Sequence, residues 1–286
     1  MSSAIDSKSL GGTWKRQPWS LWGRQISAIL RLEVRKNFIG KRAILIYLLA
    51  LGPVFLMAAF AVEVKIHATD TLGEINEIFA NIYEGFILRT VIFFGCAWIF
   101  MNLFRGEVVD KSLHYYFLVP VRREVLVVGK YVSGVLTAGI LFFCTTGLSL
   151  FFVYLSFGYP QNVDYLEGAG LGQVLSYLSI TLLACVGYGA FFLVIGLFFR
   201  NPIIPAGLAY GWEWLNFLLP PVLKKISVIH YLHSLAPVPV SEGPFAMLAE
   251  PTPAWISVPG LLLVTALALV LASLQIRRMQ ISYSGE

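Results

Sequence analysis

The amino-acid sequence predicts an all-α polytopic membrane protein with about six transmembrane helices. Of its 286 residues, 57% are hydrophobic and only 13% are charged, whereas a soluble domain carries about 25% charged residues. The hydrophobic residues gather in runs of about 20, which is the length that an α-helix needs to cross about 30 Å of hydrocarbon. A soluble fold of this size buries only about three quarters of its chain surface, so it could not hide this many apolar side chains.

Six hydrophobic runs are predicted to cross the membrane. They cover residues 43–62, 86–104, 131–157, 174–199, 202–219 and 255–275. The third run can be extended back to Val125. The fifth run is the weakest of the six, because it is short, contains Glu213 and ends at Pro220-Pro221.

The positions of the Lys and Arg residues predict the orientation of these runs. Seventeen of the 21 lie in the N-terminal segment, the loop after the second run, the turn after the fourth run and the C-terminal tail, and three lie on the opposite side. Because cytoplasmic loops carry an excess of Lys and Arg, the segment 1–42 and the tail 276–286 are both expected in the cytoplasm. The domain 43–275 is then expected in the plasma (inner) membrane as a multi-pass protein. Since the basic charge lies at the ends of hydrophobic runs, we expect the lipid bilayer, and no nucleic acid, as its surroundings.

The stretch 18–42 is predicted to form an amphipathic helix. Apolar side chains recur every four residues from Trp22 to Phe38, with basic residues between them. Such a helix can lie in the head-group layer with its cations near anionic lipid. The alternative is a charged flank that only sets the topology.

The loop 105–124 contains a second predicted amphipathic helix. Residues 104–118 are expected to be helical and to end before Pro120, because a residue that precedes proline tends to leave the helical region. Leu113 and Phe117 fall on one face of this helix. From the pattern alone, the helix is equally suited to dock a soluble partner and to lie on lipid.

The loop 219–254 is rich in proline and still contains the apolar segment Ile226–Leu235. It predicts a short re-entrant or surface helix at the outer face, followed by an irregular stretch.

The sequence motifs of common enzymes are absent. The sequence contains no Gly-x-x-x-x-Gly-Lys-Ser/Thr phosphate-binding loop, no Gly-x-Ser-x-Gly and no His-Glu-x-x-His. His230 and His233 share one helix face, but zinc usually takes three or four protein ligands. We therefore predict no catalytic residue, no cofactor-binding residue and no metal site in this chain.

Two ionisable residues lie inside predicted spans. Arg89 is about 5 Å and Glu213 about 9 Å from the outer end of its run, at about 1.5 Å per residue. Such groups are costly in hydrocarbon and need a partner or a wet cavity. If the two helices are neighbours, the side chains could form an ion pair that fixes helix packing. The alternative is a polar element of a substrate path.

Small residues and cysteines add two further expectations. Gly207 and Gly211 form a small-xxx-small face that favours close helix approach, either within the subunit or in a dimer. Cys96, Cys144 and Cys185 all lie in apolar runs, so we expect buried core residues and no disulfide set.

Several of these features together resemble the membrane subunit of a type-2 ATP-binding-cassette (ABC) exporter. The family's membrane subunit has a basic amphipathic connecting helix before six spans. Its first cytoplasmic loop has a glutamate, a helix, a Pro-x-Arg turn and a Gly-Lys entering the third span. The similar residues here are Phe104-Arg105-Gly106-Glu107, Leu113, Leu118-Val119-Pro120-Val121-Arg122-Arg123 and Gly129-Lys130. Trp212-Glu213 and the segment Ile226–Leu232 are similar to one bacterial branch of the family.

The resemblance implies that residues 104–118 are the coupling helix, which docks on an ABC ATPase subunit. The expected coupling residues are Glu107, Asp110, Lys111, Leu113, Phe117, Arg122 and Arg123. This chain has no nucleotide-binding domain, so ATP and Mg would bind to the separate ATPase subunit. A second permease subunit, identical or related, would complete the exporter.

Two other classes of function stay open. A channel-like or assembly membrane protein without an ATPase fits the topology but leaves the loop pattern unexplained. An intramembrane enzyme would need a nucleophile, an acid and a base near one membrane depth, and Glu213, Arg89 and scattered serines form no recognisable set. Nothing in the sequence indicates the substrate.

Overall fold

The structure is a computed structural model that describes residues 19–40, 43–67, 71–109, 121–156, 163, 165–224, 227–240 and 252–278. It confirms the predicted all-α polytopic membrane protein. The described residues form helices and no strand, and five of these helices are long and apolar enough to cross a membrane.

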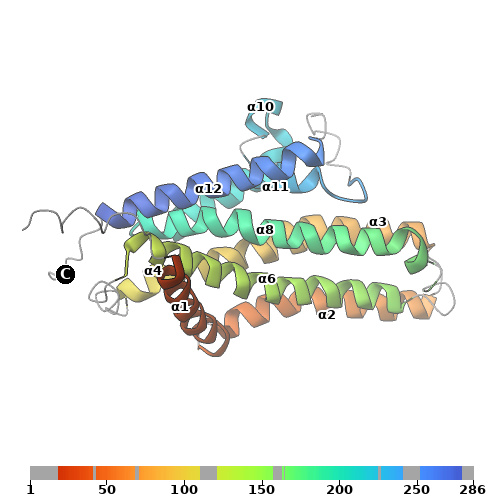
Figure 1. The fold of residues 1–286 in the computed structure, drawn as a ribbon. Coiled ribbons are helices and arrows are strands. Elements are labelled where there is room, and N and C mark those ends of the chain that lie inside the picture. The colour runs from red at the N-terminus through yellow and green to blue at the C-terminus, as the bar shows by residue number, and fades with distance from the viewer. Residues whose placement is uncertain are drawn as a thin grey trace, which may run out of the picture.

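The helices follow one another along a single elongated bundle (Figure 1). In chain order they are α1 (Trp19–Ile39), α2 (Ala43–His67), α3 (Leu72–Ile82), η2 (Tyr83–Ile92), α4 (Phe93–Val109), α6 (Arg123–Leu155), η3 (Leu166–Gly170), α8 (Leu171–Phe198), α9 (Ile203–Trp214), η4 (Leu215–Leu218), α10 (Pro221–Lys224), α11 (Val228–His233) and α12 (Ala254–Arg278). The elements α3, η2 and α4 join into one continuous spanning helix, of which η2 is a π-helix.

Four of the predicted spans form helices with nearly the predicted bounds. They are α2, α6, α8 and α12, and α6 begins at Arg123, close to the early start near Val125. The predicted run 86–104 lies inside the longer helix Gly73–Val108. Most of the predicted amphipathic segment 18–42 forms α1, Trp19–Ile39, which packs against α6 at one end of the bundle. We call this end, where the C-terminal end of α12 also lies, the α1 end (Figure 1).

The predicted fifth span requires a correction. Residues 202–219 form the 12-residue helix α9 followed by one turn of 3₁₀-helix, η4. A helix of 12 residues rises only about 18 Å, so it is shorter than the hydrocarbon core. The short helices α10 and α11 follow it, and α11 packs against α8 and α12. Between α8 and α12 the chain therefore forms four short helices, α9, η4, α10 and α11, in place of one spanning helix.

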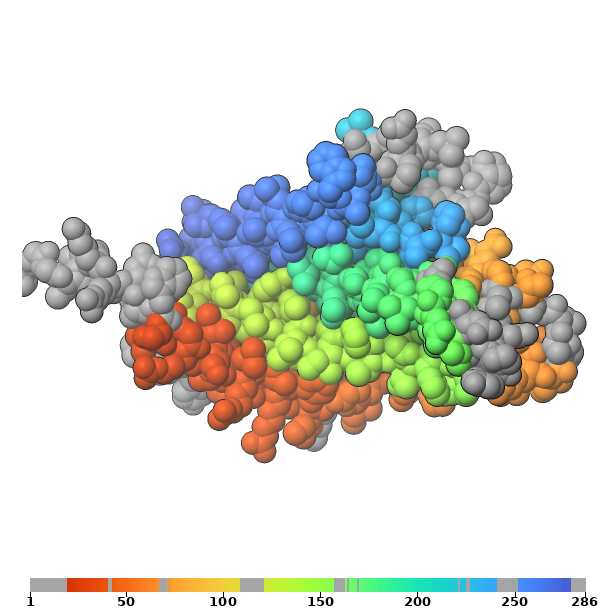
Figure 2. Space-filling view, turned by 45° about the vertical axis from the view of Figure 1, so that its right-hand side comes forward, coloured from red at the N-terminus to blue at the C-terminus, as the bar shows by residue number. Residues whose placement is uncertain are grey.

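The helices are not equally buried. In the spanning part of α8, 72% of residues are buried, against 22% in α12 and 28% in α2. Figure 2 shows α12, in blue, and α1 and α2, in red to orange, on opposite sides of the molecule. The centre of the bundle is therefore formed by α8 and α4, and α2 and α12 are peripheral.

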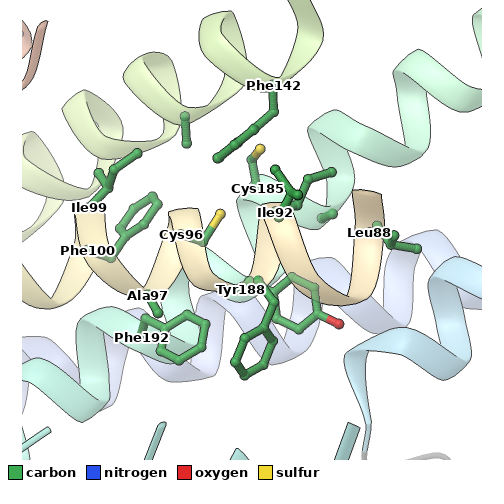
Figure 3. Packing of buried hydrophobic residues seen from close by; sticks show 14 of the residues in the cluster. Leu88, Ile92, Cys96, Ala97, Ile99, Phe100, Phe142, Cys185, Tyr188 and Phe192 are labelled. Atoms are coloured by element: carbon green, nitrogen blue, oxygen red, sulfur yellow. The ribbon is translucent and has the colours of Figure 1, made fainter. Parts of the chain in front are cut away.

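Glycines let the central helices approach one another closely. The ring of Phe100 on α4 lies between Gly134 on α6 and Gly189 on α8, and a methyl group added at either glycine would collide with it. Figure 3 shows Phe100 in the aromatic core, with Cys96 and Cys185 close by. Small residues at helix contacts are the usual means of close packing inside a membrane.

The other small residues and cysteines differ in part from expectation. A methyl group added at Gly207 or Gly211 would meet no atom of another described segment within 4 Å, so neither glycine makes a close helix contact within the described part of the subunit. All three cysteines are free. Cys96 and Cys185 are buried as expected, whereas Cys144 is exposed.

Candidate functional site

A cluster of four charged side chains joins three helices at the α1 end. Lys130 on α6 is fully buried and donates hydrogen bonds to Glu33 Oε1 on α1 at 2.5 Å and to Glu107 Oε1 on α4 at 2.6 Å. It also donates to the Leu103 carbonyl oxygen at 2.9 Å. Lys36 Nζ lies 3.4 Å from Glu107 Oε1. We call Glu33, Lys36, Glu107 and Lys130 the charge cluster.

The charge cluster brings together two acidic and two basic side chains. Buried charges are tolerated when they are paired and hydrogen-bonded, and three bonds use the three N–H donors of the Lys130 ammonium group. Burial alone would raise the pKa of Glu33. The charge of Lys130, its hydrogen bond and the charge of Lys36 outweigh this effect and lower the pKa of Glu33 below its ordinary value. Glu33 therefore keeps its negative charge near neutral pH.

Local packing explains why these residues meet. Gly129 lies against Ile29, and a methyl group added at Gly129 would stand only 3.1 Å from Ile29 Cδ1. Ile29 and Glu33 are four residues apart, so they lie on the same face of α1. The absence of a side chain at Gly129 lets this face approach α6 until Glu33 reaches Lys130.

The same end of the bundle carries further contacts from the start of α6. The Arg122 guanidinium stands 5.2 Å from the centre of the Trp22 ring. Arg123 donates to the carbonyl oxygens of Ile276 at 2.9 Å and Arg277 at 3.0 Å. These carbonyls belong to the last turn of α12, where intrahelical donors are missing. The start of α6 is thus held to α1 on one side and to the end of α12 on the other.

The structure places only some of the expected coupling residues. Asp110, Lys111, Leu113 and Phe117 lie outside the described residues. Arg122 is exposed. Arg123, half-buried, binds α12 instead.

Glu107 requires a correction. We expected a charged contact with a partner, but the side chain is fully buried and its carboxylate binds Lys130 inside the chain. Its position links α4 to α6 and α1, so any influence on a partner would be indirect.

Sequence reasoning did not identify Glu33 or the role of Lys130. Two signals were available. Glu33 is the only acidic residue in the basic helix Trp19–Ile39, and Lys130 stands next to a long apolar run. An acidic residue such as Glu33 and a basic residue such as Lys130, each beside hydrophobic residues, indicate a buried ion pair. The sequence does not show which residues form it.

The two ionisable residues inside the predicted spans do not pair with each other. Arg89 binds Glu84 Oε1 at 2.9 Å, and the ion pair with Glu213 that would form between neighbouring helices is not made. Both residues lie in η2, and the five-residue spacing between them matches the i→i+5 repeat of a π-helix. The other oxygen of Glu84 lies 2.8 Å from His233 Nδ1 on α11. Glu84 therefore ties η2 to the short helix α11.

Glu213 is an acceptor for the start of α11. Its carboxylate receives hydrogen bonds from Ser227 Oγ at 2.7 Å, the Val228 amide at 3.1 Å and the Ile229 amide at 3.0 Å. The Tyr188 hydroxyl donates to it at 3.2 Å. These bonds satisfy amides that have no partner inside a helix. They support the structural interpretation of Glu213, with α11 as its partner in place of Arg89.

The charge cluster at the α1 end connects α1, α4 and α6 through buried ion pairs. No group of three or more His, Cys, Asp or Glu side chains in the described part of the chain is arranged to hold a metal ion. When the chain is compared with known proteins, no family model and no curated protein matches it.

Proposed function

We propose that the chain is the membrane subunit of an ATP-driven exporter of the type-2 ABC class. A separate ATPase subunit would dock on loop 105–124, which would face the cytoplasm. The observation that carries this proposal is the charge cluster: it joins α1 to α4 and α6, the two helices that flank residues 110–120. A push on the loop would therefore move three helices as one body.

The proposed mechanism needs a stiff connection between the loop and the spans. ATP closes two ATPase subunits, and each pushes on the loop of its membrane subunit. Because Glu107 and Lys130 join the end of α4 to the start of α6, these two helices cannot separate without leaving buried charges unpaired. The movement is then transmitted as a rigid-body shift of packed helices. Glu107 serves as part of this internal joint. Arg122, which is exposed and also contacts the Trp22 ring, would add a charged contact with the ATPase.

The exposed face of α9 supports a second membrane subunit. Ile203, Ile204 and Leu208 are strongly exposed, and a methyl group added at Gly207 or Gly211 would meet no atom of another segment that the structure describes. A helix face of small and apolar residues suits close packing against another helix in the membrane. The substrate path would lie between the two subunits.

The test is co-purification with a candidate ABC ATPase from the same organism. The full-length protein is expected to retain the ATPase in detergent and to stimulate ATP hydrolysis after reconstitution. Replacement of residues 110–120 by a Gly-Ser linker of equal length is expected to abolish association. A chain that purifies alone and never binds the ATPase would overturn the proposal and favour a membrane protein without an ATPase.

A second variant separates docking from transmission. Glu33→Gln weakens the charge cluster at α1 without touching the loop, so the ATPase is expected to bind while its stimulation falls. Glu77→Gln, an exposed position on α3 at the other end of the bundle, is the matched control. Equal stimulation by both variants would contradict the proposed role of the cluster.

A further inference from the structure

A mostly apolar cavity of about 400 Å³ lies between α8, α9, α11 and α12. Its walls include Phe191, Trp212, Leu261 and Val264. The volume is within the range of small-molecule sites, which are apolar clefts with a few well-placed polar groups.

Two polar groups line this cavity, and the first is the Thr265 hydroxyl on α12. The side chain is 7% exposed, and its oxygen has no hydrogen-bond partner among the residues that the structure describes. Elsewhere in the bundle, Thr137 and Thr145 donate to the backbone carbonyl four residues earlier, which is the usual solution for a helical threonine. Thr265 does not use it. A buried hydroxyl without a partner is costly, so a ligand that hydrogen-bonds to it would gain affinity.

The second polar group is the Glu213 carboxylate. Oε2 receives three hydrogen bonds, from Tyr188, Ser227 and Ile229, whereas Oε1 receives one, from the Val228 amide. An oxygen of this kind can accept a second bond from a ligand hydroxyl. Glu213 acts as an acceptor in each of these bonds, so it offers a hydrogen-bond donor of the ligand a partner and an anionic head group none. The chemistry therefore favours an uncharged ligand with a hydroxyl group.

The cavity is accessible from the side of the bundle. Phe191, Trp212 and Val264 line it and are themselves exposed, at 39%, 38% and 50%. They stand on the flank of a membrane-spanning bundle, where the hydrocarbon of the bilayer begins. The molecule that can enter from this side is a membrane lipid.

We propose that this cavity binds an uncharged single-chain lipid with a hydroxylated head group, a monoacylglycerol-like molecule. The acyl chain lies along Phe191, Val264 and Ala268, and a hydroxyl group bonds to Thr265. The site is separate from the charge cluster, and its occupation does not depend on an ATPase.

The experiment is photolabelling of the purified full-length protein in nanodiscs with a monoacylglycerol that carries a diazirine in its acyl chain. Labelled peptides are expected from α8, α9 and α12 around the cavity. Thr265→Val keeps the shape of the side chain and removes the hydroxyl, so labelling should fall about two- to tenfold, the effect of one hydrogen bond. A fatty acid with the same diazirine chain should label less than the monoacylglycerol.

A matched pair of alanine-to-leucine substitutions tests whether the lipid occupies the cavity. Ala268→Leu fills the cavity and should strongly reduce labelling, whereas Ala266→Leu changes an exposed neighbour that does not line it and should leave labelling unchanged. Equal labelling of wild type, Thr265→Val and Ala268→Leu would overturn the proposal, as would labelled peptides that lie away from the cavity. Disulfide-linked pairs of a Val264→Cys variant would show instead that a second copy covers this face, which would also overturn it.

Discussion

Lys130 and Glu107 meet at 2.6 Å from opposite flanks of the loop 110–120. They are 23 positions apart, and Glu33 on α1 completes the contact from a third helix. The two ends of the loop are therefore held together by charge, at a place where the side chains are shielded from solvent. The structure of this joint leads to predictions that do not depend on any partner.

Loss of Lys130 should destabilise the protein strongly. Lys130→Met leaves the carboxylates of Glu33 and Glu107 buried without their main partner, and removal of one member of a buried ion pair costs about 3–5 kcal/mol. Lys36→Met is the matched control, because this side chain is 44% exposed and its pair is longer; exposed pairs contribute about 0–1 kcal/mol. Thermal unfolding in detergent measures both. Similar losses for the two variants would contradict the central role of Lys130.

Acid should weaken the attachment of α1. The pKa of Glu33 is lowered from 4.5 in the folded protein, so the unfolded chain binds the proton more readily. The resulting stability is present above pH 4.5 and is lost as the pH falls through the folded-state pKa. The difference in unfolding free energy between wild type and Glu33→Gln should therefore be largest near neutral pH and shrink below pH 4.5. A difference that grows on acidification would contradict the lowered pKa of Glu33 in the folded protein.

The pairing of Arg89 can be measured with double-mutant cycles. Arg89→Met and Glu84→Gln remove two partners of one ion pair, so their effects on unfolding should be non-additive by about 0.5–3 kcal/mol. The cycle of Arg89→Met with Glu213→Gln should give a clearly smaller coupling, because Glu213 is bonded to Ser227 and the start of α11. A larger coupling with Glu213 would contradict this pairing of Arg89 with Glu84.

Two glycine substitutions should have opposite outcomes. Gly189→Ala forces a methyl group against the Phe100 ring, which cannot retreat because Gly134 is tight on its other side. Overpacking of this kind costs about 1–3 kcal/mol. Gly207→Ala meets no atom of another segment among the described residues and should be neutral or stabilise α9 by up to about 1 kcal/mol, the difference in helix propensity. Unfolding of the monomer in detergent distinguishes them, and a loss of stability at Gly207 in the monomer would contradict this placement.

The sequence predicted the parts of the fold that depend on local composition. Long apolar runs can hardly be anything but spanning helices, so α2, α6, α8 and α12 were found with nearly correct bounds. The broken segment after α9 was only partly predicted, because its shape depends on Glu213 reaching the amides of Val228 and Ile229, a contact that no local pattern encodes.

The candidate site was harder to predict for a related reason. The pairing of Arg89 depends on the π-helical geometry of η2, which brings Glu84 onto the same face, whereas the ordinary α-helical repeat would turn the two side chains apart. The charge cluster depends on the close approach of α1 and α6 at Gly129. In both cases the sequence supplied the charges, and the backbone path decided their partners.

The shortness of α9 has a consequence for the surrounding bilayer. Its 12 residues span about 18 Å, whereas the hydrocarbon is about 30 Å thick. Beyond it, η4 and α10 are single helical turns, with the Leu219 amide bonded to the Asn216 carbonyl and the Lys224 amide to the Pro220 carbonyl. Such hydrophobic mismatch is relieved when lipids thin beside the short element. Head groups should therefore approach the midplane more closely along α9 than along α8, so the bilayer next to this protein has unequal thickness on its different sides.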